Sequence, residues 1–170
     1  MATLERIHFV PHHVVCGDKS TTYSPSNSQP SIEGLPQLFW ADCMPWREAN
    51  LWAVERATTG NASLKTVVSN MNGLLNYAKF LESHHLHWFE FPVRKADRCL
   101  VLYRGALIRT RDAGQISPST ASEYMRNCVM FYRWVKHKEL LSPSLTLWRD
   151  KPYLVKYFDQ IGFERTISGI

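Results

Sequence analysis

Apolar residues recur at helical spacing along most of the chain after Trp40. The pattern is clearest from residue 62 or 63 to residue 83, where apolar side chains at i, i+3, i+4 and i+7 predict an amphipathic helix. The same periodicity predicts helices over residues 46–57 and 95–113, and a fourth helix that begins at Ser117 and continues into the basic run near residue 138.

The predicted helix ends carry suitable residues. Pro45 fits a first helical position, Ser117 can cap the fourth helix and Pro118 fits its first turn. Gly114 suits a left-handed cap after the third helix, whose apolar residues nearly surround it and predict a central, mostly buried position. With four helices and no convincing strand pairing, we expect an all-α bundle.

The first part of the chain differs in composition. Residues 5–16 could form a short strand, and Ser, Pro, Gly and Asn then follow one another closely, which is typical of a loop or mobile arm. We therefore expect a loop-rich N-terminal arm over residues 1–37 and a helical domain over residues 38–148.

Charge is distributed unevenly along the chain. The net charge is +5, but residues 94–138 contain ten Lys or Arg and three acids, which gives +7 for this block alone and −2 for the rest. Such a block suits a polyanionic partner, although a solvated basic surface would have the same composition. The sequence has neither a run long enough to cross a bilayer nor a secretory leader pattern, and its four scattered cysteines include no CxxC pair, so we expect an intracellular protein that binds no membrane.

The predicted fourth helix presents hydroxyl and cationic side chains opposite its apolar stripe. At about 100° per residue, this outer side carries Ser119, Ser122, Arg126, Arg133 and His137. The N-terminus of the helix adds free backbone N–H groups, which favour phosphate, and arginine can pair with guanine. Capping by Ser117 beside solvated arginines is the simpler interpretation, but it leaves Ser119, Thr120 and Ser122 unexplained.

The predicted second helix has a comparable polar side, which carries Lys65, Ser69, Asn72 and Asn76. Asparagine is a poor helix former but can pair with adenine through two hydrogen bonds. An ordinary polar surface explains any one of these residues equally well. Two such sides in one basic domain favour nucleic acid over either side taken alone.

Other kinds of chemistry have weaker support. The histidines at positions 12, 13, 84, 85 and 87 lie in predicted loops without recognised ligand spacing, so a metal-dependent enzyme is only a third hypothesis and we expect no metal or cofactor. The sequence contains no HExxH, no glycine-rich phosphate loop and no GxSxG. Most tryptophans are expected to form the core.

Two segments resemble a known family. "SLKTVVSNMNGLLNYAKFLESHHL" and, after a spacer, "GQISPSTASEYMRNCVMFYRWVKHKELLSPS" resemble the core-binding domain of tyrosine recombinases, the phage integrase family. The resemblance covers about residues 40–147, with Ser142-Pro143 where the family usually has Asn-Pro and Asn70 where a tyrosine is frequent. Strings such as "PWREANLWAVERA" and "GFERT" look like integrases carried by bacterial mobile elements.

The resemblance implies a fold and a role. The fold would be a small orthogonal four-helix bundle (SAM-like) that forms half of a clamp on duplex DNA, and residues 149–170 would lead toward a separate catalytic domain. The chain contains no His-x-x-Arg, so we expect it to bind DNA without cutting it and propose none of its tyrosines as the nucleophile. The partners implied are double-stranded DNA and other recombinase protomers in a synaptic complex, with no small-molecule substrate, in the bacterial cytoplasm at the nucleoid.

The residues expected to face DNA combine both predicted helix faces and are Lys65, Ser69, Asn72, Asn76, Ser117, Ser119, Thr120, Ser122, Arg126, Arg133 and Lys136. The alternative from another functional class is an all-helical protein-interaction domain that mediates oligomerisation.

Overall fold

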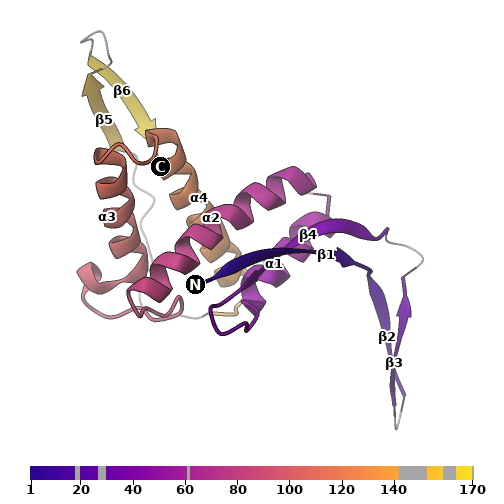
Figure 1. Cartoon of the computed structure of the whole chain (residues 1–170). Helices are drawn as coiled ribbons and strands as arrows, with labels where there is room; N and C mark the ends of the chain where they lie inside the picture. The colour runs from indigo at the N-terminus through magenta and orange to yellow at the C-terminus, as the bar shows by residue number, and fades with distance from the viewer. Residues whose placement is uncertain (18–19, 27–29, 61, 142–152, 159–163, 170) are drawn as a thin grey trace.

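The chain has a mixed α/β fold in which four strands precede four helices (Figure 1). The computed structural model describes residues 1–17, 20–26, 30–60, 62–141, 153–158 and 164–169. The elements are β1 (Thr3–Phe9), β2 (His12–Cys16), β3 (Thr21–Pro25), β4 (Ile32–Phe39), α1 (Arg47–Thr58), α2 (Leu64–Ser83), α3 (Cys99–Asp112), α4 (Pro118–His137), β5 (Tyr153–Phe158) and β6 (Glu164–Gly169).

The prediction of an all-α bundle is therefore wrong. β1 pairs with β4, and β2 pairs with β3, in two antiparallel two-stranded sheets. Every residue of β2 and β3 is exposed, so these strands lack the alternation of buried and exposed positions that marks a strand in a sequence. β3 also lies within the segment rich in Ser and Pro that predicted a loop, and β4 runs across the expected domain boundary between residues 37 and 38.

β1 and β4 form a ribbon that packs against α1 and α2. Leu35 and Leu38 of β4 are fully buried and join the hydrophobic interior. The side chain of Asn50, on α1, accepts a hydrogen bond from Leu38 N at 2.7 Å and donates one to Leu38 O at 3.0 Å. The amide therefore satisfies the backbone at the outer edge of β4, where a further strand would otherwise be needed.

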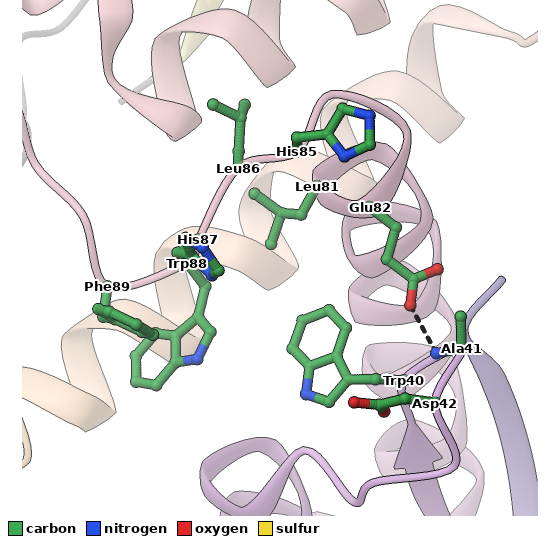
Figure 2. Close-up of a pocket in the computed structure, with 10 residues that line it drawn as sticks. All are labelled: Trp40, Ala41, Asp42, Leu81, Glu82, His85, Leu86, His87, Trp88 and Phe89. Carbon is green, nitrogen blue, oxygen red and sulfur yellow. Dashed lines mark hydrogen bonds between the residues drawn. The ribbon is translucent and has the colours of Figure 1, made fainter.

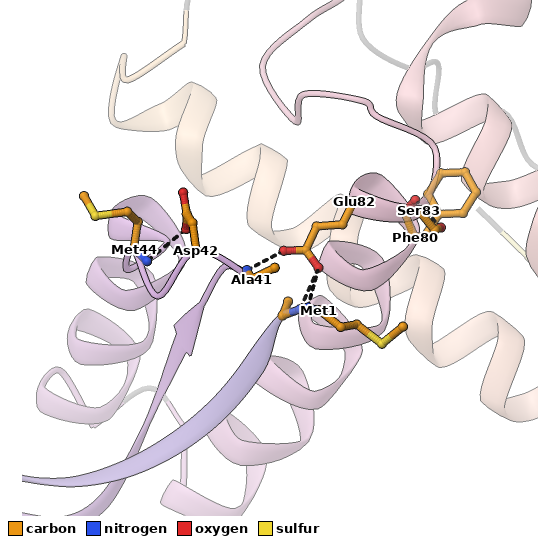
Figure 3. Close-up of polar contacts among 8 residues, drawn as sticks. Met1, Ala41, Asp42, Met44, Phe80, Glu82 and Ser83 are labelled. Carbon is orange, nitrogen blue, oxygen red and sulfur yellow. Dashed lines mark hydrogen bonds and ion pairs between the residues drawn. The ribbon is translucent and has the colours of Figure 1, made fainter.

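Glu82 at the end of α2 ties one end of this ribbon, where β1 begins and β4 finishes, to the helices (Figure 3). Its Oε2 accepts a hydrogen bond from Ala2 N at 2.6 Å, and its Oε1 accepts one from Ala41 N at 2.7 Å. One carboxylate thus fixes the chain both before β1 and after β4.

The strands β2 and β3, which we call the distal ribbon, extend away from the helices (Figure 1). Among the described elements, β2 and β3 contact only each other. The hydrogen bond from Ser26 N to Pro11 O, at 2.7 Å, closes the base of the distal ribbon. Of the residues expected to form a loop-rich N-terminal arm, those of the distal ribbon extend from the body as paired strands, whereas Ala2 and Leu35 are buried.

The crossing of α2 and α4 depends on a glycine and two amides. A Cβ atom at Gly73 would lie 2.9 Å from the Cβ of Asn127, so only glycine allows the helices to approach this closely. The buried Asn70 donates a hydrogen bond from Nδ2 to Asn127 Oδ1 at 3.0 Å. Asn70 is therefore an interhelical contact within the core.

The core is rich in aromatic rings. Trp46 is 1% exposed, and its ring centroid lies 4.7 Å from Trp40, 5.2 Å from Phe131 and 5.9 Å from Trp88. These residues come from the segment after β4, from α4 and from the α2–α3 loop, so the cluster joins three parts of the chain. The prediction that tryptophans build the core is confirmed for Trp46, Trp52 and Trp88, whereas Trp148 lies outside the described residues.

The third helix is less central than its composition predicts. Leu100, Tyr103 and Leu107 of α3 are buried, but Val101 and Ile108 are exposed, because α3 packs on one side only. The expectation of a mostly buried α3 is therefore wrong. A helix with apolar residues all round can still lie at the surface when it leaves part of its apolar face uncovered.

The four cysteines divide into two pairs by burial, and this gives a testable prediction. Cys16 and Cys43 are exposed, whereas Cys99 and Cys128 are buried. Burial raises the pKa of Cys128 well above its ordinary value, so this thiol stays protonated and unreactive. We expect a water-soluble maleimide to modify two thiols of the native protein rapidly and all four after denaturation, as measured by mass spectrometry. Rapid modification of Cys128 in the native state would contradict the packing.

The last described elements, β5 and β6, form an antiparallel pair. They fall in the range expected to be a linker, while residues 142–152 of the expected helical domain and linker lie outside the described residues. No helix in the described part of the chain has the combination of length and apolar content needed to span a membrane.

Candidate nucleic-acid interface

The N-terminus of α4 carries a cluster of hydroxyl groups. Ser117 caps the helix, and its Oγ accepts a hydrogen bond from Thr120 N at 3.1 Å. The hydroxyls of Ser119 and Thr120 each lie 2.8 Å from Ser117 Oγ. The cap was predicted from the sequence and is confirmed, and the cluster also gives Ser119 and Thr120 a local structural role.

The outer side of α4 continues from this cluster along the helix. Ser122, Arg126, Arg133 and Lys136 are all exposed, and the two arginines are seven residues apart, or about two helical turns. Phe131 and Tyr132, next to Arg133, are buried. The helix therefore separates a cationic outer side from an aromatic inner side.

On α2, Lys65, Asn72 and Asn76 are exposed, but two of the predicted residues bond within the protein. Asn76 Oδ1 accepts a hydrogen bond from Tyr103 Oη at 2.8 Å. Burial raises the pKa of Tyr103 well above its ordinary value, so the phenol stays protonated and remains a donor. The carbonyl of Asn76 is thus engaged by α3. Of the four residues predicted on this helix, Lys65 and Asn72 therefore remain as the ones directed outward.

Ser69 connects the two helices at the surface. Its Oγ donates a hydrogen bond of 2.7 Å to Glu123 Oε1 on α4. This bond brings the polar edge of α2 next to the outer side of α4, so the two predicted faces meet at this point. The same carboxylate stands three residues before Arg126 on α4 and lowers the positive charge of the surface.

The sequence interpretation missed Glu123 and Tyr103. Glu123 is three residues before Arg126 and four after Ser119, a spacing that places all three on one side of a helix. Helical spacing could therefore have identified Glu123. The bond between Tyr103 and Asn76 depends on how α3 packs against α2, and periodicity contains no signal for it.

Six of the ten basic residues in the block lie on two helices, α3 and α4. Arg104 and Arg109 are exposed on α3, while Arg126, Arg133 and Lys136 are exposed on α4. Only the α4 group continues from a capped helix N-terminus that can offer N–H groups to an anion. These two sets provide a test of whether position or net charge determines binding.

No significant match to this chain was found among protein-family models, among curated proteins or among solved structures. The resemblance to the core-binding domain of tyrosine recombinases therefore depends on the residues of α2 and α4 and the segments that flank them.

The histidines do not assemble a metal site. Within the described ranges, no group of three or more His, Cys, Asp or Glu side chains is arranged to hold a metal ion. His84 Nδ1 lies 2.9 Å from Ser83 Oγ and 3.0 Å from Phe80 O, so it completes the end of α2. The geometry gives no support to the hypothesis of a metal-dependent enzyme.

Proposed function

We propose that this chain is a DNA-binding module of a site-specific tyrosine recombinase, which binds duplex DNA but does not cleave it. The outer sides of α4 and α2 form the contact surface. The backbone N–H groups and hydroxyls at the start of α4 hold a phosphate, and Arg126 and Arg133 extend the contact along the duplex. Lys65 and Asn72 contribute from α2, and the module works in the bacterial cytoplasm together with other protomers of the recombinase.

One observation supports this proposal most directly. The capped, hydroxyl-rich N-terminus of α4 continues into exposed arginines, and Ser69 joins this helix to α2 at the surface. An α-helix fits the major groove of B-DNA, and arginine, serine and asparagine are common donors to its phosphates and base edges. The buried Tyr103 donates its hydrogen bond to Asn76, so in this proposal Tyr103 positions the side chain of Asn76 without touching DNA.

A salt titration of duplex binding tests the proposal. Lys65, Arg126, Arg133 and Lys136 could neutralise up to four phosphates, so we expect the logarithm of the association constant to fall with the logarithm of salt concentration with a slope of about −2 to −4. Fluorescence anisotropy of a labelled random-sequence duplex measures this slope. The expected dissociation constant is in the micromolar to submillimolar range, on the order of 10⁻⁶ to 10⁻⁴ M.

The control partner is poly-glutamate, which has negative charge without the geometry of a double helix. Equal affinity for poly-glutamate and for DNA would show that the surface recognises charge alone, and a slope near zero for DNA would contradict the proposal.

The alternative function, protein interaction, cannot depend on an all-helical surface because the fold is mixed. The distal ribbon is the feature that favours it, since its residues are exposed and contact no helix among the described elements.

A further inference from the structure

The outer side of α4 carries a carboxylate between its hydroxyl cluster and its arginines. Glu123 is the only acidic residue of α4 and is exposed. It lies four residues after Ser119 and three before Arg126, so the three side chains share one side of the helix. A carboxylate repels the phosphates of a duplex at close range. A surface that bound DNA through charge alone would therefore bind more tightly without Glu123.

The hydrogen bonds of Glu123 leave one of its oxygens available. Glu82, beside the pocket between the end of β4 and the α2–α3 loop (Figure 2), shows a carboxylate with a structural role. Both of its oxygens accept bonds from backbone N–H groups, of Ala2 and Ala41. Glu123 differs, because Oε1 accepts a bond from Ser69 Oγ at 2.7 Å while Oε2 accepts none from the described residues. Oε2 is thus an unused acceptor on an exposed surface.

Glu123 is held by α2 and is not neutralised by its neighbour on α4. Residues three apart on a helix can form an ion pair, but in the part of the chain that the structure describes no ion pair joins Glu123 to Arg126. The bond from Ser69 restricts the rotation of the Glu123 side chain. A contact made by Oε2 therefore costs less conformational entropy than a contact made by a mobile carboxylate.

The chemistry of a fixed carboxylate narrows the choice of partner on DNA. An ionised carboxylate only accepts hydrogen bonds, and phosphates have no donor to offer. An α-helix enters the major groove, where the donors are the amines at N4 of cytosine and N6 of adenine. Adenine places the acceptor N7 beside its amine, whereas cytosine presents its donor alone. A carboxylate in the major groove therefore favours cytosine.

We propose that Glu123 is a specificity-determining residue, which accepts a hydrogen bond from N4 of a cytosine, and that Ser69 is its positioning residue. At 1.5 Å per residue, Arg126 is about 4.5 Å further along the helix axis, and successive base pairs are about 3.4 Å apart. Arg126 can therefore reach the guanine of the same or the next base pair. The inference rests on the proposed DNA binding and adds to it a position at which affinity depends on sequence.

Selection from a library of random-sequence duplexes at low salt tests the proposal. Bound duplexes are separated on a native gel and sequenced, and we expect the natural protein to enrich cytosine at one position. Two duplexes that differ only at this position should differ about fivefold in affinity by fluorescence anisotropy, as for a single base contact. Glu123→Ala should lose this preference and bind random duplex about two- to fivefold more tightly, because the repulsion is removed. Ser69→Ala should weaken the preference without changing the charge.

Glu123→Gln separates base recognition from charge. The amide oxygen can still accept the bond from Ser69, which places the NH₂ group, a donor, where Oε2 was. A donor opposite N4 of cytosine is unfavourable, so the preference should move to a base with an acceptor there, such as guanine. The matched control is Glu5→Gln, which removes a carboxylate from an exposed position on β1 and should keep the preference for cytosine.

The outcomes distinguish this inference from the proposed function. The same enriched base in the natural protein and in Glu123→Ala would overturn the role of Glu123, even if the variant bound more tightly, and so would salt-dependent binding without any base preference. Both results leave the proposed DNA binding intact, whereas binding that does not depend on salt would overturn both proposals. Each variant is assayed well below its melting temperature, so that loss of the fold is not mistaken for loss of recognition.

Discussion

A variant with both Arg126→Ala and Arg133→Ala is expected to bind duplex DNA about ten- to a hundredfold more weakly than the natural sequence at low salt. Both arginines are exposed on the outer side of α4, so their removal should leave the fold intact. Each phosphate contact releases counterions when it forms, so the loss of two contacts should make the salt slope less steep by about 1.8. Anisotropy titrations at several salt concentrations measure both effects.

The matched control for this variant is Arg104→Ala with Arg109→Ala, which removes the same charge from exposed positions on α3. We expect this second variant to keep most of the salt slope, since general attraction falls off within a Debye length of about 10 Å. Equal losses in the two variants would show that net charge, and not the surface of α4, determines binding. Thermal melting of each variant confirms that the fold is retained.

The variant Gly73→Ala is expected to lower the free energy of unfolding by about 1–3 kcal/mol. Alanine is the better helix former by about 1 kcal/mol, so a gain would be expected if Gly73 were an ordinary helical position. Here the added Cβ would lie 2.9 Å from Asn127 Cβ, and α2 and α4 would have to separate. Separation would also strain the hydrogen bond between Asn70 and Asn127. Urea denaturation followed by circular dichroism measures the change.

Gly105→Ala on α3 is the matched control. A Cβ at Gly105 would meet only the end of the Arg109 side chain, at 3.5 Å, which is an ordinary contact. This substitution should therefore stabilise the protein by up to about 1 kcal/mol. If both variants were stabilised to the same degree, the close approach of α2 and α4 would not exist in solution.

The helices could be predicted because their signals are local. The apolar positions of α2 repeat at helical spacing, and Ser63 and Ser117 are good caps directly before α2 and α4. The aromatic core was in part expected, since most tryptophans were predicted to lie in it. The position of α3 was not predictable in the same way, because its apolar residues face both the core and the solvent.

A short strand was expected within residues 5–16, but the pairing of β2 with β3 could not be predicted, for a physical reason. A half-buried strand shows an alternating pattern, but β2 and β3 bury neither face. Their pairing depends on backbone hydrogen bonds, such as that between Ser26 N and Pro11 O at the base, which leave little trace in composition. Of the predicted site, exposure of Arg126, Arg133 and Lys65 followed from helical spacing, whereas the internal bonds of Ser69 and Asn76 depend on how the helices cross.

The pairing of Phe9 with Ile32 has a consequence for how this molecule can change. Phe9 is the last residue of β1 and Ile32 is the first residue of β4. Because these two residues are paired, the segment between them is attached to the rest of the fold at a single place. Insertions or deletions in this segment, or its replacement by another, would not alter the path of the chain through α1, α2, α3 or α4. Its length and sequence can therefore diverge in evolution independently of the surface on α4.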